Sequence, residues 1–183
     1  MKKNIVFLLF GLLMSSSIFA QENSVKANPL AVFGGTDLFS YERAVTDKSS
    51  GIVGAGFSSF KFGDFKYQTI GGKAEYRYYF NSALEGWFAG AGVQYQNGKV
   101  EVDSGSITFD GSSSTSDEIN FNGIGVGAKG GYQWIWDSGF TLDLNLGLNY
   151  VSFSYDDSDN STFSTLKGSG ILPALGFGLG YSW

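Results

Sequence analysis

The chain has 183 residues, among them 27 Gly and 17 Phe, and a formal net charge of −5. It contains no Cys and no His, which excludes a disulfide framework, a thiolate zinc site and the commonest catalytic base. An acidic chain with scattered Lys and Arg does not have the composition of a nucleic-acid binder, and we expect no cofactor and no metal ion.

Residues 1–20 have the order of a secretory signal peptide. Lys2 and Lys3 come first, an apolar run covers 5–14, and a stretch of small residues ends at Ala20. The apolar run is too short to cross a bilayer as a helix. We therefore expect export and cleavage after Ala20, with residues 21–183 forming one β-barrel domain; a retained N-terminal anchor is the alternative.

After residue 20 the chain alternates apolar with small or polar residues, which predicts strands. The expected strands cover 25–33, 37–45, 51–62, 67–80, 86–96, 124–135, 139–155 and the stretch that ends at residue 183. The parity of the first and third is ambiguous. A change of parity near Asn122 predicts either a bulge or a strand that extends beyond the membrane.

The predicted connections differ between the two ends of these strands. They are short at 46–50, 81–85 and 136–138, and long, acidic and Ser-rich at 99–117 and 156–167. This layout is typical of outer-membrane barrels. The sequence thus predicts an all-β fold, an eight-stranded antiparallel up-and-down transmembrane β-barrel with both termini in the periplasm.

The two faces of the predicted strands differ in chemistry. One face carries Leu, Phe, Tyr and Trp with almost no charge, and the other is mostly Gly, Asn and Gln. Gly weakens a solvated strand but suits the crowded lumen of a small barrel, so we expect the apolar face to contact lipid. Aromatic residues near the strand ends predict a girdle at the short-turn end: Tyr78, Phe80, Trp87, Tyr132, Trp134, Trp136, Phe140, Tyr181 and Trp183. The expected location is the cell outer membrane, with outer-membrane lipid and lipopolysaccharide as partners.

Six charged residues fall on the face assigned to the lumen: Glu42, Lys73, Glu75, Arg77, Lys129 and Asp143. They lie at a similar depth from the short turns, and three are acidic while three are basic. Since unpaired buried charges are very costly, we expect them to pair with one another. The cluster predicts a salt-bridge plug; a polar constriction in a narrow pore is the alternative.

The chain ends with aromatic and aliphatic residues that alternate with small ones: Phe177, Leu179, Tyr181 and Trp183. This ending is typical of the C-terminal signal by which outer-membrane proteins reach the barrel-assembly machinery. We expect that machinery and periplasmic chaperones as partners during biogenesis. An ordinary terminal strand is the alternative.

Several stretches resemble small barrels of the outer membrane protein beta-barrel domain families (porin-like, OmpA/OmpW-like). They are VKANPLAVFGGTDLFSYERAVTDKSSGIVGAGF, AEYRYYF, GWFAGAGVQY, GAKGGYQW and GFGLGYSW. The resemblance covers residues 24–183, and its motifs are generic. It implies the fold and the location and carries no site residues across.

The sequence favours a structural or envelope role with a mostly closed polar lumen. The alternatives are a narrow porin-like channel for small solutes, and a surface adhesin or ligand-binding barrel that acts through loops 99–117 and 156–167. We do not expect an enzyme, because membrane-barrel hydrolases and acyltransferases rely on His. A G-x-G-x-x-G match at Gly125–Gly130 continues as a strand, which argues against a nucleotide site.

Overall fold

The computed structural model describes residues 21–33, 35–63, 65–102, 117–157 and 167–183. Residues 1–20, to which the signal-peptide prediction applies, lie outside this set, as do residues 103–116 and 158–166 of the two predicted long loops. Within the described part of the chain, no helix has the length and apolarity needed to cross a bilayer.

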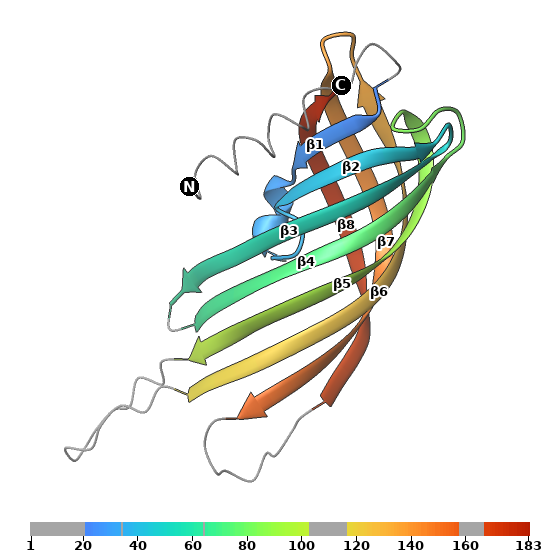
Figure 1. Cartoon of the computed structure of the whole chain (residues 1–183). Helices are drawn as coiled ribbons and strands as arrows, with labels where there is room; N and C mark the ends of the chain where they lie inside the picture. Colours follow the sequence, from blue (N-terminus) through green and yellow to red (C-terminus); the bar gives the residue numbers. More distant parts are fainter. Residues whose placement is uncertain (1–20, 34, 64, 103–116, 158–166) are drawn as a thin grey trace, which may run out of the picture.

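Eight antiparallel strands form a closed up-and-down barrel, which confirms the predicted fold class (Figure 1). Each strand pairs with the next along the chain, and β1 pairs with β8 to complete the ring. The strands are β1 (Asn23–Ala27), β2 (Phe39–Thr46), β3 (Ser49–Phe62), β4 (Phe65–Tyr79), β5 (Gly86–Val102), β6 (Asp117–Ile135), β7 (Phe140–Asp157) and β8 (Lys167–Ser182).

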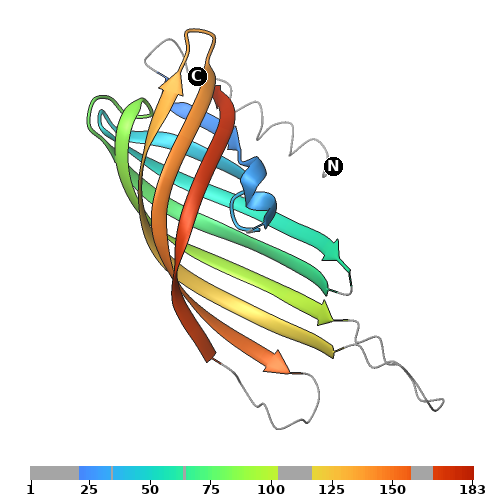
Figure 2. The same ribbon diagram turned by 180° about the vertical axis from the view of Figure 1, so that it is seen from behind.

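The barrel has two unlike ends, which we name the turn end and the loop end. The turn end holds the C-terminus and the short connections β2–β3, β4–β5 and β6–β7; it is uppermost in Figures 1 and 2. The loop end holds the β3–β4 turn and the far ends of β5, β6, β7 and β8. The short connections therefore lie together, as the sequence predicts.

Apolar side chains cover the outside of the barrel. Leu144, Leu146 and Leu148 of β7 point outward, and on β8 the exposed fraction is 37% at Leu179 and 72% at Leu175. The intervening residues face the lumen, where Thr141 and Asp143 are buried. The period-two pattern thus places the apolar face outside, as the parity of the residues predicts.

Glycine on the inner face lets neighbouring strands and side chains approach closely. A Cβ at Gly147 would collide with the Ala128 carbonyl oxygen and with Lys129, and a Cβ at Gly180 would collide with the Val25 carbonyl oxygen. The small inner residues are therefore a packing requirement of this narrow barrel rather than a flexible element.

The predicted strand 25–33 is wrong beyond Ala27. Pro29 has no N–H to donate to a ladder, and residues Pro29–Phe33 form a short 3₁₀ helix, η1, instead. Asn28 stabilises this departure: its side chain accepts a hydrogen bond from Leu30 N at 3.1 Å, and its own N donates to the Leu38 carbonyl at 2.9 Å.

The strands β5 and β6 are longer than the alternation predicts. They pair continuously from Gly86↔Gln133 to Val102↔Asp117, through Asn97↔Asn122. The predicted bulge near Asn122 is therefore absent from this ladder. The apparent change of parity arises because Phe121 faces the lumen while Asn122 faces outward, where it accepts hydrogen bonds from Tyr95 and Asn97.

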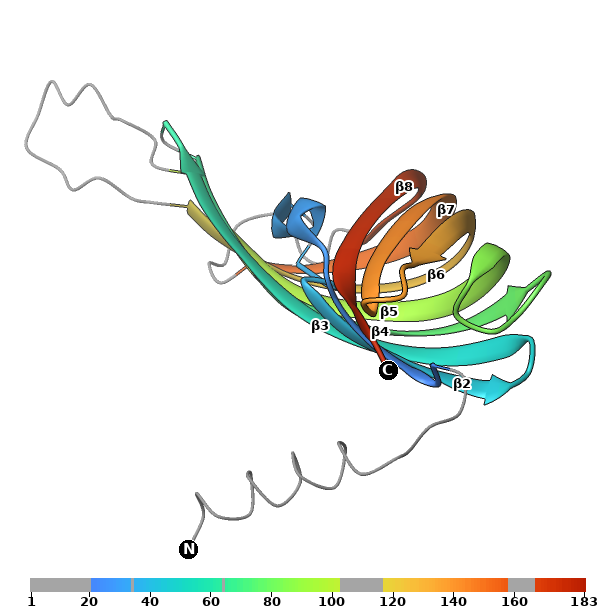
Figure 3. The ribbon, with the colours of Figure 1, turned by 90° about the horizontal axis from the view of Figure 1, so that it is seen from above.

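The short β1 and β2 leave one side of the ring without a strand toward the loop end. β1 pairs with β8 only over Leu179–Ser182, and β2 extends only to Ala55 on β3. Among the described residues, no strand pairs with the free sides of β8 over 167–178 and of β3 over 56–62. The helix η1 lies in this space, between β3 and β8 (Figure 3).

Candidate functional site

Two groups of charged side chains fill the lumen, one above the other. The group nearer the turn end, which we name the buried quartet, consists of Lys26, Glu42, Arg77 and Asp143. Lys26 Nζ lies 2.6 Å from Glu42 Oε2 and 2.7 Å from Asp143 Oδ2, and Arg77 Nη1 contacts Asp143 and lies 3.7 Å from Glu42. None of the four side chains is more than 4% exposed. The group is electrically neutral.

Neutral side chains complete the hydrogen bonding of the buried quartet. The Tyr79 hydroxyl donates to Glu42 Oε1 at 2.7 Å, and the Ser50 hydroxyl donates to the same oxygen. Gln133 Oε1 accepts from Lys26 Nζ at 2.7 Å. A buried ion cluster keeps its charges only when its remaining lone pairs and protons are also bonded, and these contacts meet that condition.

The β4–β5 connection closes the turn end next to the buried quartet. Leu84 has a positive φ of 69°, which is rare outside glycine, and its side chain is fully buried. Its carbonyl accepts a hydrogen bond of 2.6 Å from the inward-facing Gln133 Nε2. Tyr79 and Phe88 pack there as well, and the Arg77 guanidinium lies 4.0 Å from the centre of the Phe88 ring. This end of the lumen is filled.

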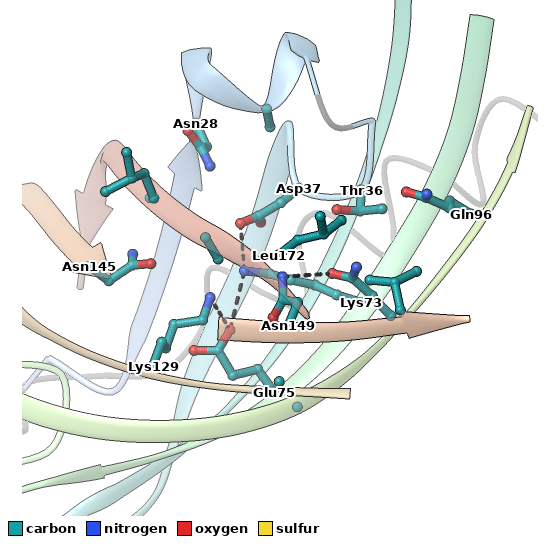
Figure 4. A pocket seen from close by; sticks show the side chains of 18 of the residues that line it. Asn28, Thr36, Asp37, Lys73, Glu75, Gln96, Lys129, Asn145, Asn149 and Leu172 are labelled. Carbon is teal, nitrogen blue, oxygen red and sulfur yellow. Dashed lines mark hydrogen bonds and ion pairs between the residues drawn. The ribbon is translucent and has the colours of Figure 1, made fainter. Parts of the chain in front are cut away.

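The second group, which we name the cavity quartet, consists of Asp37, Lys73, Glu75 and Lys129. Lys73 pairs with Asp37 and lies 3.3 Å from Glu75 Oε2, while Lys129 Nζ lies 2.8 Å from the same oxygen (Figure 4). Arg77 Nε donates to Glu75 Oε1 at 2.7 Å and so joins the two quartets. Glu75 is as buried as the buried quartet at 2% exposed, whereas Lys73, Lys129 and Asp37 are 10–20% exposed.

A cavity of about 380 Å³ lies between the cavity quartet and the loop end. Carboxamides supply much of its polar lining, namely Asn28, Gln94, Gln96, Asn145 and Asn149. Its apolar wall comes from Leu30 and Ala31 of η1, from Val151 and Phe153 of β7, and from 172–176 of β8. The cavity is therefore charged at its floor and apolar on one side.

A row of aromatic rings lines the lumen near the loop end. Tyr67 lies 5.1 Å from Phe60 and stacks on Phe121 at 5.9 Å, and Phe121 contacts Phe153 at 6.0 Å. The rings of Phe121 and Phe153 lie over Gly98 and Gly123, where a Cβ would crowd them. The bare strand surface at these glycines is thus covered by aromatic side chains from neighbouring strands.

The structure brings all six charged residues of the predicted lumen cluster together. Glu42, Arg77 and Asp143 lie in the buried quartet, and Lys73, Glu75 and Lys129 lie in the cavity quartet. Sequence reasoning missed Lys26 and Asp37. The alternation of Ser24 and Lys26 with Val25 and Ala27 indicates that Lys26 faces inward, but extending the predicted strand through Pro29 made its parity ambiguous. Asp37 lies in the β1–β2 connection, where the alternation of a strand does not apply.

The four residues of the predicted C-terminal signal lie on the outer face of β8 or directly after it. Phe177, Leu179 and Tyr181 alternate with inward residues, and the Tyr181 and Trp183 rings stack at 6.3 Å. The Trp183 carbonyl accepts hydrogen bonds from Glu22 N at 2.9 Å and Asn23 N at 3.0 Å. The last residue therefore also helps to close the ring, through its backbone.

The described residues contain no group of three or more acidic side chains arranged to hold a metal ion. The chemistry of the lumen is that of ion pairs, amides and an apolar wall.

Comparison with known proteins gives a family and a fold. A family model described as "Protein of unknown function (DUF3575)" matches residues 5–172. No curated protein matches the sequence. The structure is similar to the crystal structure of a major outer membrane protein from Thermus thermophilus, with a TM-score of 0.52 and 14% identity over 90% of this chain and 100% of that chain. At this identity the likeness concerns the fold, and neither comparison names the OmpA/OmpW-like families that the sequence motifs resemble.

Proposed function

The chain belongs to the DUF3575 family, and from that premise and its own geometry we propose that it is a small integral protein of the cell outer membrane. In this proposal it has a structural, non-enzymatic envelope role and a lumen closed at the turn end. It is exported by the signal peptide of residues 1–20, and the barrel-assembly machinery inserts it among outer-membrane lipid and lipopolysaccharide. The observation that carries the proposal is the combination of an apolar exterior with a charged interior.

The apolar exterior has the height of a bilayer. It runs from Phe140 to Tyr150 on β7 and from Tyr181 to Ile171 on β8, with outward-facing apolar side chains between these limits. A tilted transmembrane strand needs about 9–11 residues. A monomer in water rarely exposes an apolar surface of this extent, whereas a transmembrane barrel needs one where it contacts lipid.

Aromatic residues mark both edges of the band. At the turn end, Trp87, Trp136 and Tyr78 are exposed on the outside, and toward the loop end Tyr95 and Tyr150 are exposed. Amphipathic rings prefer the headgroup level of a bilayer, so two rings of aromatic residues indicate its two interfaces. The outward polar pair Asn97 and Asn122 lies beyond the second edge, which supports a strand that extends out of the membrane.

The interior supports a closed barrel over a channel. A conducting pore would need a water path past the buried quartet, Tyr79 and Leu84, all of which are buried. The charges there pair at contact distance, so the buried quartet has no net charge that would favour one sign of ion. A narrow porin-like channel is the alternative, and planar-bilayer conductance distinguishes the two.

Fluorescence quenching tests the membrane proposal. The four Trp of the chain all lie near the turn end, and Trp87 is 62% exposed on the outer face. After refolding into liposomes, we expect lipids brominated on the acyl chain near the headgroup to quench Trp emission strongly and aqueous acrylamide to quench it weakly. Refolding in detergent-free buffer provides the control. Strong acrylamide quenching with no effect of the brominated lipids would contradict the proposal.

A further inference from the structure

We propose that the cavity binds a single-chain amphiphile with an anionic headgroup, of the class of a long-chain carboxylate. The headgroup binds at Lys129, and the hydrocarbon chain leaves sideways through the seam between η1 and the free edge of β8. The inference rests on the proposed membrane location, because the hydrocarbon chain would then continue into the bilayer.

The charge distribution of the cavity quartet favours an anion at Lys129. Among the described residues, Lys129 has one ion-pair partner, Glu75, and that carboxylate also binds Lys73 and Arg77. Glu75 is thus shared among three cations, whereas Lys73 also pairs with Asp37, so Lys129 is the less neutralised of the two lysines that face the cavity. Asn145 and Asn149 line the same cavity, and their amide groups can donate to a carboxylate (Figure 4).

The seam offers an exit for a hydrocarbon chain. Residues 172–176 of β8 line the cavity, and along the strand edge opposite β7 none of the described strands pairs with them. Pro173 lies in this stretch, and since it has no N–H, it suits a free edge. Leu30 on η1 and Leu172 on β8 are both 47% exposed and both line the cavity. The wall here is therefore made of side chains rather than of a continuous sheet.

The environment of the seam explains why an amphiphile fits better than other occupants. Inside a bilayer, an open sheet edge persists only where it lines a polar cavity or is covered. A volume of about 380 Å³ lies at the lower end of the range for ligand pockets, so it accommodates a headgroup and the first carbons of a chain. The rest of a long chain then needs an apolar path outward, which the seam between Leu30 and Leu172 provides. A purely polar solute would make no use of that apolar wall.

Native mass spectrometry of the refolded mature chain in detergent tests the proposal. We expect one palmitate to bind per barrel, with hexadecanol and hexadecylamine each binding at least tenfold more weakly. Lys129→Gln should weaken palmitate binding at least tenfold, and Lys129→Arg should largely restore it. Ala174→Trp should abolish binding because the indole fills the cavity, whereas Ala91→Trp on the exposed outer face of β5 should bind palmitate like the parent. Heat-modifiable electrophoretic mobility shows that each variant is folded.

Several outcomes would overturn the inference. They are absence of saturable palmitate binding, equal binding by folded Ala174→Trp, or equal affinity for hexadecanol. Mass spectra that show a dimer without bound palmitate would assign the seam to a second copy of the chain and would also overturn it. The membrane proposal is judged separately by quenching with brominated lipids, so a barrel that inserts but binds no palmitate refutes only the ligand.

Discussion

At the scale of single residues, the lumen depends on a few charges that cannot be removed one at a time. Arg77 contacts Asp143, Glu75 and Glu42, and its contact with Glu75 links the two quartets. Burial of these ions is costly, and the cost is offset only while each retains its partners. The stability of the interior therefore depends on the whole set of ion pairs rather than on the strength of any one of them.

Arg77→Met should lower the free energy of unfolding by about 3–5 kcal/mol, because it leaves buried carboxylates without their counter-charge. Urea unfolding of the protein refolded in liposomes measures the change. Arg43→Met provides the matched control, since Arg43 is exposed on β2 and should change stability by less than about 0.5 kcal/mol. Equal effects of the two substitutions would show that the ion cluster does not hold the barrel together.

Two glycines on β8 make it possible to distinguish the effect of packing on stability from the effect of backbone flexibility. A Cβ at Gly180 would meet the Val25 carbonyl oxygen and the Lys26 backbone, whereas a Cβ at Gly170 would meet nothing within 4 Å. Gly180→Ala should therefore destabilise the folded barrel by about 1–3 kcal/mol, through overpacking where β1 and β8 join. Gly170→Ala should be neutral or slightly stabilising. The same urea titration compares them, and a similar loss at both positions would contradict the packing argument.

At the scale of elements, the last residues of the chain have two roles. Their backbone pairs with β1 and closes the ring, and the outward side chains of β8 and the residue after it carry the proposed assembly signal of Phe177, Leu179, Tyr181 and Trp183. The ring closure at the last residue uses the Trp183 backbone, so the side chain can be changed without loss of those hydrogen bonds.

Trp183→Ala should reduce the amount of folded protein in the outer membrane of cells severalfold while refolding into detergent micelles stays near normal. The assembly machinery would lose its recognition residue, whereas the carbonyl of residue 183 would still accept from Glu22 and Asn23. Membrane fractionation and heat-modifiable mobility provide the two readouts. Trp136→Ala, at an exposed aromatic position of the turn end, is the control. Parallel losses in cells and in micelles would indicate a purely structural role for Trp183.

At the scale of the whole molecule, the barrel is filled at one end and hollow toward the other. The buried quartet and Leu84 fill the turn end, and the cavity occupies the space toward the loop end. The ring is also uneven, because the short β1 and β2 complete it only near the turn end. The filled part of the lumen thus lies at the turn end, and the cavity and the gap in the ring lie toward the loop end.

Planar-bilayer recordings should show no steady openings for the parent protein. Lys129→Ala and Glu75→Ala change the cavity quartet but keep the ion pairs within the buried quartet, so both variants should also remain closed. Lipid-only bilayers are the negative control, and a known porin is the positive control. Steady openings of the parent whose conductance changes in either variant would instead support the narrow channel.

The sequence by itself determined the number of strands, the apolar outer face and the placement of six charges in the lumen. These features follow from a period of two, which is local and is visible in residues such as Leu144, Leu146 and Leu148. Only the tertiary structure decided that Lys26 and Asp37 join those charges, that η1 occupies a gap in the wall, and that Leu84 closes the turn end. Those outcomes depend on where the ring closes and on which connections turn inward, and such contacts join residues far apart in the chain that no local pattern specifies.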